Sequence, residues 1–242
     1  MDDFDERNRA FIEQMGSDES VRRASREWFR ATYKHEYSYH FTWLGRPIIQ
    51  YPQDVLAVQE VIWRVRPDLI VETGIARGGS LILSASLLEL VGGDGLVVGV
   101  DIDIREHNRV EIERHPLARR IKMVEGSSLA EETFRQVERL AEGRRRVLVM
   151  LDSNHTHEHV ARELELYSAL VRAGSYLIVF DTVVEELPAE LSAERPWGPG
   201  DNPMTAVREF LEKNDRFEVD QEMQNKLLIT AAPGGYLRCV KD

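Results

Sequence analysis

Short apolar runs alternate with amphipathic stretches along most of the chain. Continuous aliphatic runs of this length predict strands buried on both faces of a parallel sheet. Between them, helical patterns end at or near glycines, over residues 79–91, 128–142 and 156–173. This alternation predicts a doubly wound α/β sheet. Five runs carry the prediction, each with an acidic residue at or near its end: 68–74, 96–103, 121–127, 147–153 and 176–182.

The end of the chain follows a different pattern. Residues 217–223 and 226–232 are two further apolar runs that leave no room for a helix between them, so we expect them to pair as antiparallel strands. The sequence therefore predicts a mostly parallel, seven-stranded sheet that ends in an antiparallel C-terminal hairpin. This Rossmann-like arrangement is typical of Class I methyltransferases.

Two segments lie outside the strand and helix repeat. Residues 1–50 are helical in pattern and then dense in aromatic residues, and we expect them to form an N-terminal cap or lid, with residues 51–242 as the methyltransferase domain. The cap either packs on the sheet or contributes to a subunit interface or a substrate lid. Residues 195–207 form a Pro- and Gly-rich loop up to a helix that begins near Pro203. This loop follows the fifth strand, where active-site loops of open α/β sheets lie.

Charge and composition argue against several classes of binding partner and of metal site. The 242 residues include 31 basic and 42 acidic side chains, a net charge of −11, which argues against binding of nucleic acid or of anionic membranes. The charged N-terminus predicts no signal peptide, and no apolar window is long enough to span a bilayer. Cys239 is the single cysteine, so neither a disulfide framework nor a cysteine-based zinc site is expected. We expect a cytoplasmic protein that forms a homo-oligomer.

The turn after the first predicted strand has the composition of a cofactor loop. In the stretch VETGIARGGS, Gly74 permits a tight turn, Gly78 and Gly79 permit close approach of a ligand to the backbone, and Ser80 can cap the next helix. The stretch is not GxGxxG, so a dinucleotide is a poorer fit. Glu72 would repel a diphosphate but accept the ammonium group of S-adenosyl-L-methionine (SAM).

The next two strand ends complete this cofactor prediction. A carboxylate after the second strand, Asp101 or alternatively Asp103, suits the hydroxyls of a ribose. Ser127 and Ser128, after the third strand, are expected to face the adenine. Ligands of such sheets bind beyond the carboxyl ends of the strands. The ordered set therefore favours SAM over NAD(P).

Three histidines follow the fourth predicted strand at alternate positions. His155 lies in a short loop after Asp152, whereas Thr156 is placed to cap the next helix. His157 and His159 then fall in the first helical turn, where residues two apart point about 200° from each other and cannot readily bind one metal ion. We interpret these two histidines as structural or solvated.

Taken together, five blocks of sequence resemble the cephalosporin hydroxylase and rhamnosyl O-methyltransferase family. The resemblance extends over about residues 40–240. Despite the first name, members are mostly SAM- and metal-dependent O-methyltransferases that act on rhamnosyl and macrolide sugars. The blocks occur in order and at natural spacing over residues 43–54, 66–80, 151–167, 174–182 and 197–211.

The resemblance implies roles for single residues. Asp152 and Asp181 match ligands of a divalent metal, typically Mg²⁺, and His155 matches a general base beside Asp152. The chain departs from the family where several members carry an adjacent Glu-Asp pair, because Phe180 precedes Asp181 here. Either Glu185 or Glu186 replaces the missing carboxylate, or water fills the position, or the metal binds more weakly.

We therefore expect a SAM- and Mg²⁺-dependent O-methyltransferase with a small-molecule or glycan acceptor. The acceptor hydroxyl would belong to a glycan terminus, a nucleotide sugar or a natural-product glycoside. Two alternatives stay open: β-lactam tailoring of the cephamycin type, and a non-catalytic methyltransferase-like partner protein. A non-haem iron oxygenase is disfavoured because none of the seven histidines begins an H-x-D/E element. A dehydrogenase is disfavoured because GxGxxG is missing.

Overall fold

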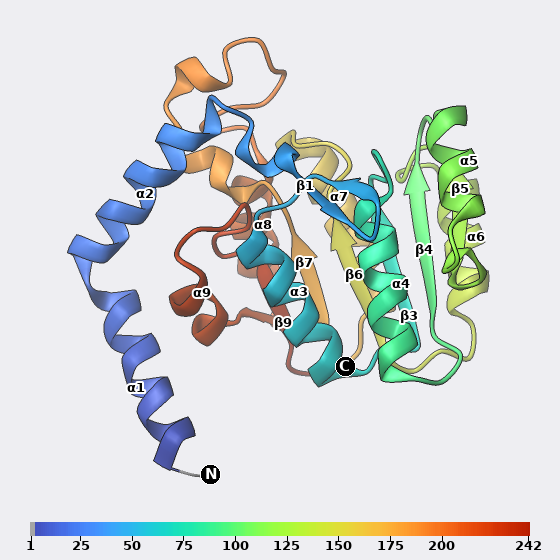
Figure 1. The fold of residues 1–242 in the computed structure, drawn as a ribbon, viewed down its shortest axis with the longest axis horizontal. Coiled ribbons are helices and arrows are strands. Elements are labelled where there is room, and N and C mark those ends of the chain that lie inside the picture. Colours follow the sequence, from blue (N-terminus) through green and yellow to red (C-terminus); the bar gives the residue numbers. More distant parts are fainter. Residues whose placement is uncertain (1–2) are drawn as a thin grey trace.

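A computed structural model describes residues 3–242, which form one open sheet with helices on both faces and a two-helix arm along one side (Figure 1). The helices are α1 (Asp3–Ser17), α2 (Glu19–Tyr33), α3 (Pro52–Val65), α4 (Gly79–Val91), α5 (Glu106–Arg114), α6 (Glu131–Ala141), α7 (His157–Tyr167), α8 (Pro203–Lys213) and α9 (Gln221–Leu227). The strands are β1 (Phe41–Trp43), β2 (Arg46–Ile48), β3 (Leu69–Thr73), β4 (Leu96–Asp101), β5 (Ile121–Glu125), β6 (Val147–Leu151), β7 (Tyr176–Val179), β8 (Phe217–Val219) and β9 (Tyr236–Cys239).

The central sheet has seven strands in the order β5-β4-β3-β6-β7-β9-β8. Adjacent strands from β5 to β7 pair in parallel, while β9 pairs antiparallel with both β7 and β8. The predicted fold, a mostly parallel sheet that ends in antiparallel C-terminal strands, is confirmed. The chain leaves β3 in one direction along the sheet and returns through β6 in the other. The crevice for ligands is therefore expected between the carboxyl ends of β3 and β6.

Two apolar cores lie on opposite faces of this sheet. One contains buried residues of α3, α4 and α9, and the other contains buried residues of α6, α7 and α8. Every residue of β3 and of β6 is buried, as the continuous apolar runs predict. Helix α4 has the predicted bounds, whereas α6 and α7 are shorter than predicted, and a 3-10 turn follows α7 over Ser168–Leu170.

The prediction of a strand over residues 226–232 is wrong. The last strand of the sheet is β9, and α9 occupies part of the segment that was expected to be extended, so β8 is also shorter than predicted. Asp220 starts the helix, because its side chain accepts a hydrogen bond from the backbone N–H of Met223 at 3.0 Å. Met223 and Leu227 are four residues apart and both are buried. These apolar residues therefore form the buried face of a helix and not part of a strand.

The N-terminal segment has two structural parts. Helices α1 and α2 form the arm, and α1 packs against α9 (Figure 1). A small antiparallel hairpin of β1 and β2 follows and lies against the start of α4. The division of the chain at residue 50 stays a prediction.

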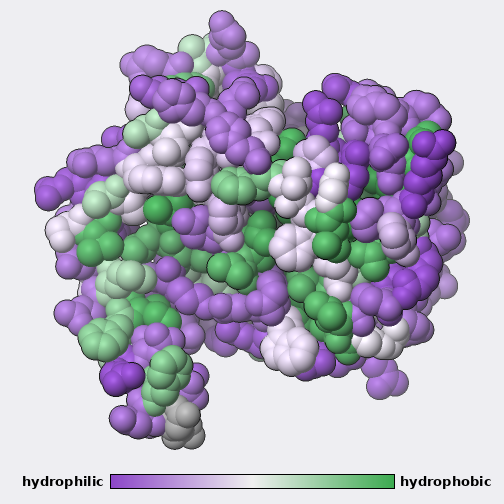
Figure 2. All heavy atoms as spheres, in the orientation of Figure 1, coloured by the Kyte–Doolittle hydropathy of each residue, from purple (hydrophilic) through white to green (hydrophobic). Residues whose placement is uncertain are grey.

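One face of the molecule carries exposed apolar side chains. Figure 2 shows hydrophobic residues across the middle of the face on which α3 and α4 lie. Leu56 and Trp63 of α3 and Leu90 of α4 are among the exposed large side chains. The predicted homo-oligomer stays a prediction. No helix within residues 3–242 is long and apolar enough to cross a lipid bilayer.

Gly74 lies where the chain leaving β3 packs closely against the chain leaving β6. Its φ is +90°, and a Cβ atom there would lie 2.1 Å from the carbonyl oxygen of Asp152. The backbone N–H of Gly74 donates to Val100 at 2.8 Å, while that of Asp152 donates to Thr73 at 2.9 Å. These bonds extend the sheet into the loops and align the strand ends, so the glycine is required by packing as well as by its turn.

We expect Gly74→Ala to lower the free energy of unfolding by about 2–4 kcal/mol, because it adds backbone strain and a collision with backbone atoms. Gly174→Ala is the matched control, since φ is +88° there but no atom lies within 4 Å of the added Cβ. The control should cost about 1–2 kcal/mol. Urea unfolding of both variants checks this, and equal losses would contradict the close approach as the cause.

Candidate active site

Acidic side chains gather at the carboxyl ends of three neighbouring strands. Glu72 lies near the end of β3, Asp152 directly follows β6, and Asp181 follows β7 after Phe180. The backbone N–H of Phe180 donates to the carbonyl of Leu151 at 3.0 Å, which aligns the ends of β6 and β7. The parallel strands therefore bring together carboxylates that are far apart in the sequence.

Three side chains at this edge form a candidate metal centre. Asp152, His155 and Asp181 each offer a ligand atom, and these atoms lie within 4.8 Å of one another. His155 Nε2 lies 3.2 Å from Asp181 Oδ2. Two carboxylates and an imidazole are a donor set that fits a divalent cation. The sequence-predicted ligands and the predicted base are thus neighbours.

The carboxylate that Phe180 displaces has no substitute in this cluster. Phe180 is 4% exposed and belongs to the core. Glu185 instead accepts hydrogen bonds from Gly200 N at 2.8 Å and Asn202 Nδ2 at 2.6 Å, while Glu186 is exposed. Neither glutamate is among the clustered residues. Within the described chain, the imidazole of His155 is the third donor of the group.

Gln50 is a member of the site that sequence reasoning missed. Its side chain is 8% exposed, and its Nε2 donates to Asp152 Oδ2 at 3.2 Å. The buried Oε1 of Gln50 has no hydrogen-bond partner. Gln50 lies inside the first of the five family-like blocks, WLGRPIIQYPQD, and a polar residue within that apolar stretch was the available signal.

The carboxylates repel one another because burial removes the water that would separate their charges. Burial raises the pKa of Asp152 well above its ordinary value, and the charges of Asp181 and then Glu72 raise it further. Burial also raises the pKa of Glu72 to about 8, against a smaller opposing effect of its hydrogen bond from Ser80. One oxygen of Glu72, Oε2, is buried without a partner. An electrostatic environment of this kind favours binding of cations.

The glycine loop has a different internal structure from the one expected. A Cβ on Gly78, where φ is +80°, would meet the side chain of Ile112, and one on Gly79 would meet the carbonyl oxygen of Pro47 in the hairpin. Both glycines are therefore required by packing of the protein itself, and the predicted approach of a ligand to their backbone stays a prediction. Gly78 takes the N-cap position of α4, and the hydroxyl of Ser80 donates to Glu72 instead of capping the helix.

The two candidates for the ribose site differ in their surroundings. One oxygen of Asp101 accepts hydrogen bonds from the N–H groups of Ile75 at 2.8 Å and Ala76 at 3.3 Å, and the other accepts from Asp103 N at 3.1 Å. Asp101 therefore holds the glycine loop against the end of β4. The side chain of Asp103 is 73% exposed. Both residues lie at the mouth of the crevice and stay candidates.

The two serines after β5 are placed differently. Ser127 is half-buried, and its Oγ accepts a hydrogen bond from Leu129 N at 3.3 Å. Ser128 is 5% exposed, and its Oγ lies 3.1 Å from His159 Nε2. The adenine contacts predicted for both stay predictions.

His157 and His159 lie outside the metal-ligand cluster and contact different parts of the fold. The backbone N–H of His157 donates to Asp201 at 2.7 Å, and its ring lies 2.8 Å from Thr205 Oγ1 and 3.0 Å from Glu209. His157 thus ties α7 to α8 and to the loop before it. His159 turns inward, toward the ends of β5 and β6. The rings of His157 and His159, two residues apart on α7, point to different parts of the fold as helical geometry requires.

The Pro- and Gly-rich loop reaches the candidate metal centre. Trp197 packs edge-on against His155, with ring centroids 4.7 Å apart at an interplanar angle of 90°. Arg195 lies 5.5 Å from the centroid of the Trp197 ring. A bridge between Gly198 and Asp201 closes the turn that follows. The loop therefore covers one side of His155, as its place after β7 predicts.

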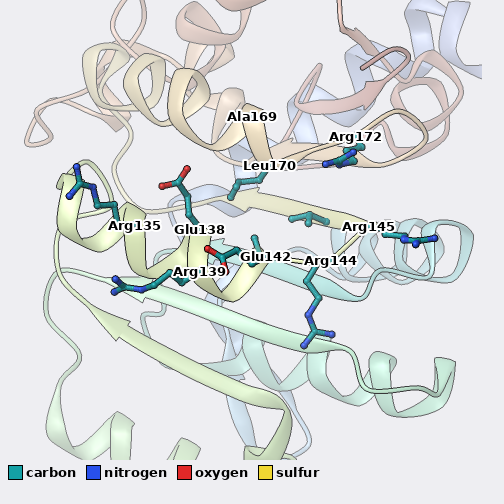
Figure 3. A pocket seen from close by; sticks show the side chains of 12 residues that line it. Arg135, Glu138, Arg139, Glu142, Arg144, Arg145, Ala169, Leu170 and Arg172 are labelled. Carbon is teal, nitrogen blue, oxygen red and sulfur yellow. The ribbon is translucent and has the colours of Figure 1, made fainter.

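A wide groove lies away from the candidate metal centre. This groove of about 740 Å³ lies at the amino end of β6, far along the strand from Asp152, and five arginines and two glutamates line it. Figure 3 shows their guanidinium groups spreading outward, with Glu138 and Glu142 between them. The groove contains none of the clustered metal-ligand residues. Its arginines are Arg135, Arg139, Arg144, Arg145 and Arg172.

Comparisons with known proteins agree with this geometry. The family model described as Rhamnosyl O-methyltransferase/CmcI matches residues 35–240. The rhamnosyl O-methyltransferase of Mycobacterium tuberculosis (strain H37Rv) is 31% identical over 202 residues, which cover 81% of this chain and 77% of that protein. The protein of the same name from Mycobacterium leprae is 29% identical over 199 residues, covering 81% of this chain and 82% of the relative.

Solved structures share the fold. An apo structure of CmcI superposes with a TM-score of 0.60 at 21% identity, covering 84% of this chain and 78% of that one. CmcI with Mg and SAM gives 0.57 at 20% identity, covering 84% and 77%. An O-methyltransferase from Bacillus cereus, solved with S-adenosylhomocysteine, gives 0.52 at 18% identity, covering 90% and 91%. These likenesses confirm the predicted methyltransferase fold.

The raised pKa of Glu72 predicts how the stability of the ligand-free protein depends on pH. The pKa of this carboxyl is about 8 when folded and 4.5 in its ordinary state, so the unfolded chain loses this proton at lower pH than the folded chain. The wild type should therefore lose stability as pH rises from about 4.5 to about 8. Relative to wild type, Glu72→Gln should gain up to about 1.4 kcal/mol per pH unit within that window and then level off.

Urea unfolding of both proteins at several pH values measures this difference. Glu132→Gln, at an exposed glutamate of α6, is the control for replacing a carboxylate by an amide. A difference for Glu72→Gln that does not vary with pH, or that only matches the control, would contradict the raised pKa.

Proposed function

Because the chain belongs to the rhamnosyl O-methyltransferase/CmcI family, and is therefore a SAM-dependent O-methyltransferase, we propose that it methylates a hydroxyl group of a sugar. The observation that carries the proposal is the cluster of Asp152, His155 and Asp181 beside the buried Glu72. This group of side chains lies at the switch point of the sheet, where a methyl donor and an acceptor can meet.

SAM would lie across the carboxyl ends of β3, β4 and β5. Glu72 and Ser80 would receive its amino-acid portion, since the unpartnered oxygen of Glu72 can accept from an ammonium group. Asp101 or Asp103 would bind the ribose, and Ser127 with Ser128 would border the adenine. Gly74 and Gly78 shape the loop beneath the ligand. The cationic sulfonium group would be stabilised by the excess of carboxylates, Asp152 included.

Mg²⁺ would bind to Asp152 and Asp181. Carboxylate oxygens are the ligands that this ion prefers, and the two aspartates lie close enough to share it. When bound, Mg²⁺ supplies Lewis acidity that lowers the pKa of an acceptor hydroxyl. Gln50 holds Asp152 in place through its amide, and it can do so whether or not the ion is present.

His155 would act as the general base. The contact between its Nε2 and Asp181 fixes the ring, and Trp197 packs against the ring edge-on. This leaves Nδ1 to take the proton of the acceptor hydroxyl as the oxygen attacks the methyl group. Alignment of the two reactants contributes the rest, because methyl transfer requires little beyond a correctly aimed nucleophile.

The acceptor would enter between the N-terminal aromatic residues and the Trp197 loop. The charge of Asp181 helps to raise the pKa of Tyr33 and of Tyr39, after burial, while Arg195 acts in the opposite direction on both. These side chains are therefore electrostatic neighbours of the metal centre, although they lie far from it in the sequence. Aromatic surfaces of this kind suit sugar rings, and the curated relatives are named as rhamnosyl O-methyltransferases.

Transfer of an isotope-labelled methyl group from SAM tests the function. The acceptors are free sugars, nucleotide sugars, rhamnosides and other glycosides, with a cephalosporin as the comparison. We expect label in a sugar class, loss of transfer with EDTA, and recovery with added Mg²⁺. Methylation of the cephalosporin alone would contradict a sugar acceptor. SAM binding without transfer to any of them would support the non-catalytic alternative.

The base assignment predicts a selective loss in His155→Ala. Turnover should fall by about 10²- to 10⁴-fold, because the proton acceptor is removed, while SAM affinity stays within about twofold in a calorimetric titration. His35→Ala, at an exposed histidine of the N-terminal segment, is the control and should match wild type. If the affinity for SAM or Mg²⁺ falls together with turnover, His155 is a binding residue and not the base.

A further inference from the structure

A second polar network joins α7 to the loops that follow β5 and β6. His159 Nε2 is 3.1 Å from Ser128 Oγ and 3.1 Å from Ser153 Oγ. Ser153 also donates to Glu163 Oε1 at 2.8 Å, and His159 Nε2 lies 3.5 Å from the same oxygen. One imidazole nitrogen of α7 therefore contacts the loop after β5 and the loop after β6 together.

The network follows one face of α7. His159, Glu163 and Tyr167 are four residues apart and point to the same side of the helix. The hydroxyl of Tyr167, a fully buried residue, donates to the carbonyl oxygen of Ser128 at 3.0 Å. The helix thus holds the β5 loop at two points, through its first turn and through its last.

Glu163 is the least usual member of this face. Its side chain has no exposed surface, and its Oε2 has no hydrogen-bond partner. A buried carboxylate is costly unless a cation and hydrogen bonds offset the loss of water. Within residues 3–242, His159 is the one basic group recorded in contact with it. Packing alone would be served as well by an apolar residue at this position.

The two loops that His159 bridges are the ones to which the proposed function assigns different ligands. Ser128 belongs to the loop expected to border the adenine of SAM, and Ser153 directly follows the metal-ligand candidate Asp152. Both serines and Glu163 make their contacts with the same imidazole nitrogen. A shift of one serine therefore changes the contact that the imidazole makes with the other serine.

We propose that His159 and Glu163 are positioning residues that couple the cofactor loop after β5 to the metal-binding loop after β6. Ordering of one loop by its ligand orders the other through the shared imidazole, so the metal ion increases affinity for the cofactor, and the reverse holds by reciprocity. The inference rests on the proposed function for the identity of the two ligands. It adds a role for two residues that touch neither of them.

The coupling is measured as the ratio of two dissociation constants. Calorimetry gives the Kd of S-adenosylhomocysteine without metal and with saturating Mg²⁺. This product is the right probe because its sulfur carries no positive charge, which removes direct repulsion of the metal ion. In the wild type the metal should lower this Kd by about fivefold or more, within the usual range for coupled sites.

Two substitutions should remove the coupling. In His159→Leu and in Glu163→Gln the ratio should fall to within about twofold of one, because the shared contacts are lost or lose their charge. His159→Gln keeps an amide that can contact both serines and should retain at least half of the wild-type ratio. Val160→Ala is the control for plain destabilisation, since Val160 is buried on the same helix without a polar role. It should lower stability in urea yet keep the full ratio.

The outcomes separate this inference from the proposed function. Absence of S-adenosylhomocysteine binding to the wild type would contradict the function itself. Normal binding of both ligands with a wild-type ratio of one would overturn the coupling alone. Retention of the full ratio in Glu163→Gln, or its loss in Val160→Ala, would likewise overturn it. If His159→Leu does not fold, Glu163→Gln and His159→Gln decide the question.

Discussion

The concentration of buried acidic groups at one edge of the sheet is the constraint on which the site depends. Burial, and after it repulsion by Asp181, raises the pKa of Asp152 well above its ordinary value. Burial alone raises the pKa of Glu72 to about 8. Such an arrangement is unfavourable for the folded chain by itself. The parallel strands impose it, because their ladder of hydrogen bonds continues to Asp152 and Phe180 and fixes where each strand ends. Cations that bind there recover the cost, which is why a metal ion and a sulfonium cofactor suit the same crevice.

Much of this fold could be predicted from the sequence, because a short apolar segment by itself indicates each central strand. The mostly apolar runs became strands whose residues are all buried, β3 and β6 among them. The segment after residue 220 was harder, since an apolar run is compatible with a strand or with a buried helix face. The N-cap by Asp220 and the four-residue spacing of Met223 and Leu227 favour the helix α9. Those signals are weaker than the run itself.

The site residues with a local sequence signal were predicted, whereas those defined by long-range contacts were not. Strand ends and the family-like blocks identified Asp152, His155 and Asp181, which the fold brings together. Gln50 was missed because its contact with Asp152 spans 102 residues and has no local signature. The packing role of Gly79 was also missed, because the atoms beside it come from a hairpin at residue 47. Long-range packing of this kind is absent from any local pattern.

A crystal structure with S-adenosylhomocysteine and Mn²⁺, located by its anomalous scattering, tests the site most directly. We expect an ion coordinated by the carboxylates of Asp152 and Asp181, with the homocysteine portion beside Glu72 and the adenine toward Ser127. An ion bound away from Asp152, or a nucleoside outside the crevice between β3 and β6, would contradict it.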